Sequence, residues 1–178
     1  MVGEIRDPET AEGAVQAALT GHLVLSTVHT NDAASAVGRL LDLDVYPFLI
    51  SGVLLGVVAQ RLVRRVCAQC SAEEVLSPEQ IDHLHIRGAE GRELRVRRGK
   101  GCPKCRGTGY RGRTGVFEVM RVTPRIRKLV QERASAQDIK REALNDGMLT
   151  LREYAIKKMA RGETTFEEVV AVTDEGVL

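Results

Sequence analysis

Four cysteines in two Cys-x-x-Cys pairs are the residues best suited to chemistry in this 178-residue sequence. Cys67 pairs with Cys70, and Cys102 pairs with Cys105; the sequence has no other cysteine. Each pair can place two thiolates on one metal ion, and two pairs complete a tetrahedral all-sulfur site. Because such a site has no open position for a substrate, we expect a structural Zn²⁺. Unrelated reduced thiols and a redox-active dithiol are the alternatives.

A second candidate set lies near the N-terminus. Glu4 and Asp7 end an expected strand, with Arg6 between them. An acidic side chain at that point can orient a water molecule or hold Mg²⁺ near a phosphate. Capping of the following helix is the alternative role for Asp7. His22 and His29 flank a second expected strand, and their spacing alone favours ordinary core or loop positions.

The order of expected elements indicates an α/β layered sheet. A strand at residues 2–7 leads into a helix that Gly21 ends, and the β-branched apolar run 22–28 is typical of a buried parallel strand. Thr30 or Asn31 then caps a second helix, and a third, apolar nearly all round, is expected over residues 47–62. Ligands of such sheets bind at the carboxyl ends of the strands, where both polar clusters fall.

Downstream of the cysteine segment, start signals predict a strand and a helical subdomain. The strand is expected over residues 113–120, and a further short helix is expected from Pro78. Four helix starts follow, each with a Ser or Thr cap; these caps are Thr123, Ser135, Thr150 and Thr164.

Composition and charge exclude several classes of protein. The net charge is +2, 28% of residues are charged, and no stretch is long enough to span a bilayer. Without a signal peptide, a cytoplasmic protein is expected. Residues 87–113 hold ten Lys/Arg and two Asp/Glu, a local charge of +8 that leaves −6 for the remainder. This basic stretch could contact anionic lipid, whereas nucleic acid is disfavoured because aromatic residues make up only 3% of the chain.

Several blocks of the sequence together resemble the ATPases of type II secretion and type IV pilus assembly. The blocks, with the cysteine spacing, are residues 3–11 (GEIRDPETA), 19–31 (LTGHLVLSTVHTN), 47–50 (PFLI), 60–64 (QRLVR) and 109–115 (GYRGRTG). The resemblance runs from residue 2 to about residue 173.

The resemblance implies a RecA-like P-loop fold, a homo-hexamer and ATP held between neighbouring chains. It places the Walker B glutamate at Glu4 and assigns a nucleotide or interface role to Arg6, His22 and His29 of the histidine box. It also assigns a structural Zn²⁺ to the four cysteines. The implied domains are residues 1–63 of the ATPase core, a zinc module at 64–112, and a strand with a helical subdomain at 113–178.

The phosphate-binding motif of that family, G-x-x-x-x-G-K-[ST], does not occur in the sequence. We therefore expect a C-terminal fragment that is catalytically silent by itself, with Mg²⁺ and ATP belonging to the complete protein.

The expected function is to couple ATP hydrolysis to pseudopilus assembly in type II secretion. The expected partners are inner-membrane secretion platform proteins, on the cytoplasmic side of the bacterial inner membrane. Type IV pilus extension is the first alternative. A non-enzymatic zinc module with a basic partner-binding face is an alternative of a different class.

Overall fold

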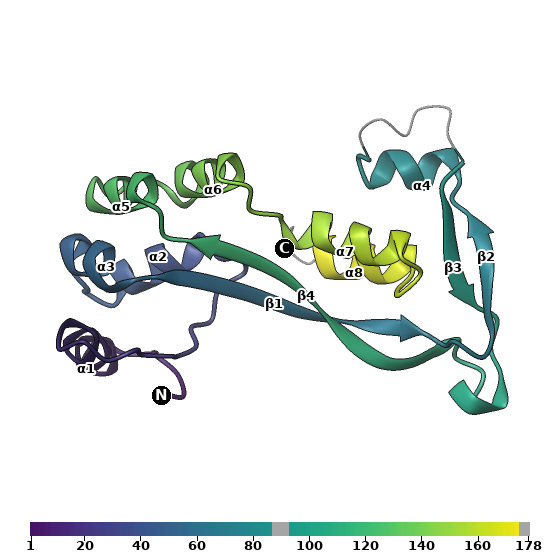
Figure 1. Ribbon diagram of the computed structural model, residues 1–178, viewed down its shortest axis with the longest axis horizontal. Coiled ribbons are helices and arrows are strands. Elements are labelled where there is room, and N and C mark those ends of the chain that lie inside the picture. The colour runs from purple at the N-terminus through teal and green to yellow at the C-terminus, as the bar shows by residue number, and fades with distance from the viewer. Residues whose placement is uncertain (87–92, 175–178) are drawn as a thin grey trace. The chain divides into compact units, whose positions relative to one another are not determined.

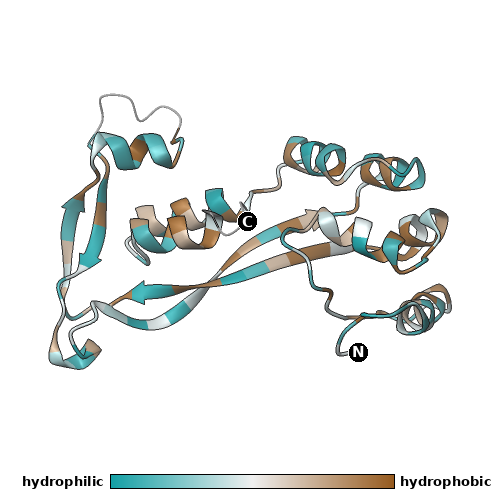
Figure 2. Ribbon diagram, turned by 180° about the vertical axis from the view of Figure 1, so that it is seen from behind, coloured by the Kyte–Doolittle hydropathy of each residue, from teal (hydrophilic) through white to brown (hydrophobic). Residues whose placement is uncertain are grey.

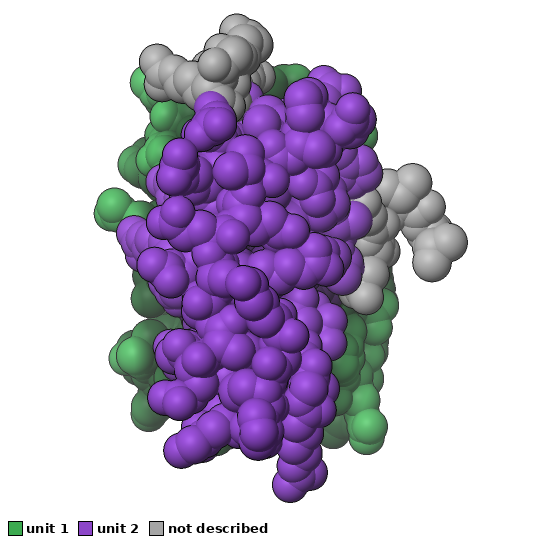
Figure 3. Space-filling view, turned by 90° about the vertical axis from the view of Figure 1, so that its right-hand side faces the viewer, with its two compact units in different colours: residues 1–59, 118–149 green, residues 60–117, 150–178 purple. Residues whose placement is uncertain are grey.

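The computed structural model describes residues 1–86 and 93–174, so the first six residues of the basic stretch lie outside it (Figure 1). The chain forms two compact units, each built from two separate stretches (Figure 3). Unit 1 comprises Met1–Ala59 and Glu118–Leu149, and unit 2 comprises Gln60–Phe117 and Thr150–Leu178. Mixed helices and strands confirm the predicted α/β class. The three predicted domain boundaries stay predictions.

Unit 1 begins with helix α1, Pro8–Leu19, as predicted. The Asp7 carboxylate accepts a hydrogen bond from the Thr10 amide at 2.8 Å, and this bond holds the pKa of Asp7 below its ordinary value. Gly21, at φ +92°, follows the end of the helix. A residue with a Cβ is disfavoured at this angle, so glycine suits the position.

Residues 22–28 do not form the predicted buried strand. Amides of Val2 and Ile5 donate to the carbonyls of Leu25 and Thr27, each at 2.9 Å, so the two segments run side by side in the same direction. No strand is assigned over residues 2–7 or 22–28, and the Leu25 side chain is exposed. Two hydrogen bonds without a further neighbouring strand in the described chain are too few to make a ladder.

Helix α2, Ser35–Asp42, and helix α3, Pro47–Val53, follow. Neither Thr30 nor Asn31 caps α2; the Asp32 carboxylate accepts from the Ser35 amide at 2.9 Å instead. The predicted helix over residues 47–62 is also wrong beyond Val53. There the chain turns extended and enters strand β1, Gly56–Val66.

The core of unit 1 joins these helices to α5, Pro124–Gln131, and α6, Ala136–Asn145. Thr123 and Ser135 cap α5 and α6 as predicted. Ile126 and Met120 are completely buried. The core residues of this cluster are Ala11, Val15, Ala33, Ala34, Val37, Leu43, Val45, Ile50, Met120, Val122, Ile126, Val130, Ile139, Ala143 and Met148.

Two two-stranded sheets account for the strands of the described chain. Strand β1 pairs with β4, Tyr110–Arg121, which includes the predicted strand at 113–120. In unit 2, β2, Ser71–Val75, pairs antiparallel with β3, Arg95–Gly99.

Short helices complete unit 2. Helix α4, Pro78–His83, has a capping box formed by Ser77 and Gln80. Helix α7, Leu151–Ala160, carries the predicted capping box of Thr150 and Glu153 and precedes α8, Phe166–Asp174. Both α7 and α8 combine hydrophobic and hydrophilic residues (Figure 2), and their buried members pack with Val63, Val96 and Val116. None of the described helices combines the length and hydropathy needed to cross a membrane.

Candidate metal centre and nucleotide-side residues

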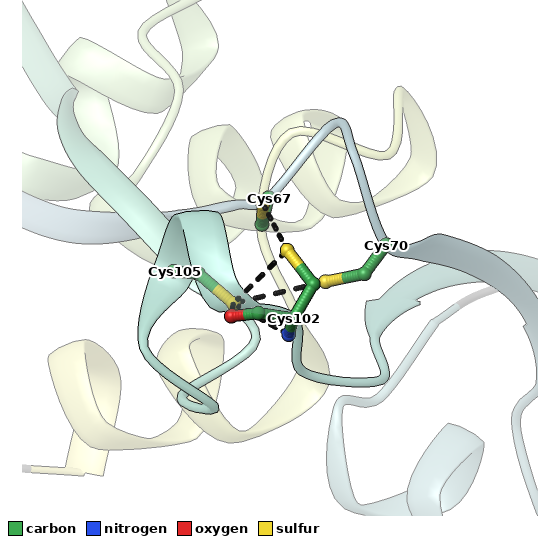
Figure 4. A group of neighbouring side chains, drawn as sticks. All are labelled: Cys67, Cys70, Cys102 and Cys105. Atoms are coloured by element: carbon green, nitrogen blue, oxygen red, sulfur yellow. Dashed lines mark hydrogen bonds between the residues drawn. The ribbon is translucent and has the colours of Figure 1, made fainter.

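The two Cys-x-x-Cys segments form matching turns in unit 2. The first follows strand β1, where the Cys70 amide donates to the Cys67 carbonyl at 3.2 Å. The second contains the short 3-10 helix η1, Pro103–Cys105, where the Cys105 amide donates to the Cys102 carbonyl at 3.2 Å. Each turn brings its two sulfurs to the same side, and the four side chains point toward one another (Figure 4).

The spacing of the sulfur atoms fits a tetrahedral zinc ion. The Sγ atoms of Cys67 and Cys102 lie 3.9 Å apart, and Cys105 Sγ lies 3.8 Å from both Cys70 Sγ and Cys102 Sγ. All four sulfurs lie within 4.8 Å of one another. The edge of a regular tetrahedron is about 1.63 times its centre-to-corner distance, so zinc–sulfur bonds of about 2.3 Å require edges of about 3.8 Å. The donor set and its geometry therefore support the prediction of a metal centre.

The surroundings of the sulfurs favour thiolates at one side of the cluster. Burial acts to raise the pKa of the Cys105 thiol, but the amides of Cys102 and Gly109 donate to its sulfur at 3.2 and 3.3 Å and lower that pKa to about 6. Burial raises the pKa of the Cys70 thiol to about 11. Because a metal ion binds thiolates, its binding releases the remaining thiol protons and strengthens as pH rises.

Close backbone contacts lock the two turns together. The Cys67 amide donates to the Gly109 carbonyl at 2.9 Å, and the Lys100 amide donates to the Cys70 carbonyl at 3.0 Å. A Cβ on Gly99 would lie 2.0 Å from the Gly109 carbonyl oxygen, far inside van der Waals contact. Glycine is therefore required where the two segments cross.

In unit 1, the structure brings two of the predicted residues together. His29 Nε2 lies 3.2 Å from Glu4 Oε1, and both side chains are open to solvent. The contact arises because the Thr27 side chain donates to the Gly3 carbonyl at 2.8 Å, next to the bond from the Ile5 amide. A carboxylate paired with an imidazole at an exposed edge can hold a water molecule in a fixed orientation.

Arg6 and His22 take other partners. Arg6 Nε lies 3.9 Å from an Asp7 carboxylate oxygen, and its side chain is exposed. His22 Nδ1 lies 3.1 Å from the Thr20 hydroxyl and 3.2 Å from the Ala17 carbonyl oxygen, at the end of α1. His29 therefore contacts Glu4, whereas His22 contacts Thr20 and Ala17.

Sequence reasoning missed three charged residues beside the His29 loop. Lys140 Nζ of α6 lies 2.7 Å from Asp32 Oδ2, and Glu118 of β4 accepts a hydrogen bond from the Ala33 amide at 2.9 Å. Glu118 is only 1% exposed. The sequence of β4 contained a signal for this buried glutamate. Side chains of a strand alternate between two faces, and Glu118 lies on the same face as the buried Val116 and Met120, two residues from each.

Comparison with known proteins relates the whole chain to one family. The profile of the family described as "Type II/IV secretion system protein" matches residues 1–171. The chain is 50% identical over 175 residues to the type IV pilus assembly ATPase PilB of Thermus thermophilus, covering 98% of the chain and 20% of that protein. It is 46% identical over 175 residues to the type II secretion system ATPase E of Vibrio cholerae, covering 98% of the chain and 34% of that protein.

Solved structures show the same fold. The ATPase DotB of Legionella pneumophila superposes with a TM-score of 0.63 at 20% identity, over 98% of this chain and 38% of that one. The pilus retraction motor PilT with bound ADP superposes with a TM-score of 0.62 at 24% identity, over 99% of this chain and 41% of that one. These likenesses confirm the predicted RecA-like ATPase fold. The chain spans a fifth to a third of the length of the curated relatives above.

Proposed function

Because the chain belongs to the type II/IV secretion system protein family, we propose that it acts as part of a type II secretion ATPase. The assembly is a homo-hexamer on the cytoplasmic face of the bacterial inner membrane, and it couples ATP hydrolysis to pseudopilus assembly through the inner-membrane secretion platform. The observation that carries the proposal is the Glu4–His29 contact of 3.2 Å, within a chain that matches the family over residues 1–171.

Within this assembly, Glu4 is the catalytic residue. Its carboxylate holds the attacking water, and His29 fixes the direction of that carboxylate. When bound, ATP would supply the electrophilic phosphorus, and Mg²⁺ would offset the negative charge of its phosphates. Since the sequence contains no G-x-x-x-x-G-K-[ST] motif, these 178 residues do not supply a P-loop to cradle the phosphates. Arg6 and His22, both exposed, are the candidates for contacts with nucleotide or a neighbouring subunit.

The zinc ion proposed for the four cysteines is structural. When bound by Cys67, Cys70, Cys102 and Cys105, it would cross-link the two turns of unit 2. Lys100, Lys104, Arg106 and Arg111 surround the turns and are exposed, which supports contact with anionic lipid headgroups.

Type IV pilus assembly is the second candidate function. The 50% identity to the Thermus thermophilus pilus ATPase supports it, although a type II secretion relative is 48% identical. The residues of the catalytic pair serve both functions equally.

The test replaces Glu4 with Gln in the chromosomal gene and measures secreted exoproteins and surface pili in the same cells. Loss of exoprotein secretion with pili intact supports type II secretion, and loss of pili with secretion intact supports pilus assembly. Glu9→Gln, an exposed glutamate on α1, is the matched control. Normal secretion and normal piliation in the Glu4 variant would contradict both functions.

A further inference from the structure

A buried carboxylate in unit 1 has no part in the catalysis proposed above. Glu118 is 1% exposed, although burial of an ionised carboxylate is costly unless hydrogen bonds and charges compensate it. Its partner is the amide of Ala33, 85 residues away in the sequence, at 2.9 Å. Ala33 and its neighbour Ala34 are both fully buried. The carboxylate therefore satisfies a backbone donor that has no access to water.

Lys140 makes the second long-range contact to the same loop. Its ammonium lies 2.7 Å from Asp32, 108 residues away in the sequence, and neither side chain is more than about a third exposed. Burial acts to lower the pKa of Lys140, but the bonded Asp32 carboxylate and the charge of Glu118 keep it above its ordinary value. Asp32 and the two residues that contact this loop from elsewhere in the fold, Glu118 and Lys140, are called the anchor cluster below.

Asp32 itself fixes the end of the loop. Its other carboxylate oxygen accepts from the Ser35 amide at 2.9 Å, at the start of α2, and from the Ser35 hydroxyl. The Asp32 carbonyl accepts from the Thr30 hydroxyl at 3.0 Å. Thr30, Asp32 and Ala33 of this loop therefore each take part in a hydrogen bond.

His29 lies between two chain segments that hydrogen bonds hold in place. On one side Thr27 bonds to the segment that carries Glu4, through its hydroxyl to the Gly3 carbonyl and its carbonyl to the Ile5 amide. On the other side, three residues later, the anchor cluster ties the loop to β4 and α6. The side chains of Met120 and Ile139, which are almost completely buried, fix those two elements in the core of unit 1.

We propose that Glu118 and Lys140 are positioning residues that hold the loop of residues 30–34, and through it the His29 imidazole, against Glu4. The proposal rests on the proposed function, because it gives the catalytic pair its geometry. The hydrogen bonds of Thr27 fix the chain only on the N-terminal side of His29. Without the anchor cluster, the loop loses the bonds that define its other end, and the imidazole leaves the carboxylate for part of the time.

The test uses this chain with its histidine rings labelled with ¹⁵N. Lys140→Met and Glu118→Leu should shift the ring signals of His29 and leave those of His22, whose partners are Thr20 and Ala17. Exchange of the Ala33 amide should rise roughly tenfold or more in Glu118→Leu, because a buried hydrogen bond is lost. Glu118→Gln keeps an acceptor of the same shape and should restore both the His29 signals and the slow exchange of Ala33.

Arg141→Met is the matched control on the same helix, because the exposed Arg141 pairs with Asp138 of α6. It should leave the His29 signals unchanged. Unchanged His29 signals in both Lys140→Met and Glu118→Leu would overturn the positioning role. The pair itself is tested separately by Glu4→Gln: if that variant leaves His29 unchanged, the proposed catalytic contact fails, whereas the Ala33 exchange still reports on the anchor cluster.

Discussion

Replacing Cys105 with Ser should weaken zinc binding at the metal centre. Cys105 Sγ lies 3.8 Å from two other sulfurs and accepts hydrogen bonds from two amides, so it is the best-connected ligand of the four. Structural zinc sites of this kind bind with about 10–16 kcal/mol. If four thiolates share that free energy equally, one thiolate accounts for roughly 3 kcal/mol, on the order of a hundredfold in the dissociation constant.

The assay is competition for zinc between the chain and a chromophoric chelator at pH 7. We expect one zinc ion per wild-type chain, X-ray absorption from four sulfurs at about 2.3 Å, and affinity weaker by about a hundredfold or more in Cys105→Ser. Lys104→Ser is the matched control, because this exposed residue lies inside the same Cys-x-x-Cys turn. Wild-type affinity in Cys105→Ser, or no zinc in folded wild-type chain, would refute the assignment.

Three further predictions concern unit 1. Ile126→Ala, at a completely buried position, should lower the free energy of unfolding by about 2–5 kcal/mol in urea titrations. Gly147→Ala should lower it by roughly 1–2 kcal/mol, because Gly147 has φ +91° after α6; an unchanged urea midpoint would contradict this. Burial acts to raise the pKa of Asp32, but hydrogen bonds from Lys140 and Ser35 hold it below its ordinary value of 3.8. The wild-type chain should therefore have a higher free energy of unfolding than Asp32→Asn at pH 7, and this difference should shrink below about pH 4. A difference that stays constant with pH would contradict this.

Local signals predicted most of the short helices, but the predicted cap at Thr164 is wrong, because α8 begins at Phe166 and the Thr164 hydroxyl donates to the Arg64 carbonyl at 2.9 Å. The caps at Ser77, Thr123, Ser135 and Thr150 each accept a hydrogen bond from an amide three residues later. A cap and its partner lie within one helical turn, so the sequence contains the whole interaction. The same locality explains why the two Cys-x-x-Cys turns could be predicted, since each turn forms within four residues.

Non-local pairing decided the elements that were predicted wrongly. The apolar run 47–62 has no periodicity that separates helix from strand, and the pairing of β1 with β4, which begins only at Tyr110, makes its second half a strand. Residues 22–28 have the β-branched composition of a strand, but a β-strand also needs a ladder of backbone hydrogen bonds to a neighbouring strand. In the described chain their partner is the short segment from Val2 to Ile5.

The candidate site shows the same division between local and distant interactions. Cysteine spacing predicted the candidate metal ligands, and the family resemblance predicted Glu4 and His29 as site residues. Neither could find the residues that contact the His29 loop. Glu118 and Lys140 lie 85 and 108 residues from their partners, so only the fold brings them there. A buried carboxylate at an inward strand position is tolerated only where a specific donor meets it. The inward glutamate of β4 was therefore a sequence signal for a long-range contact at the His29 loop.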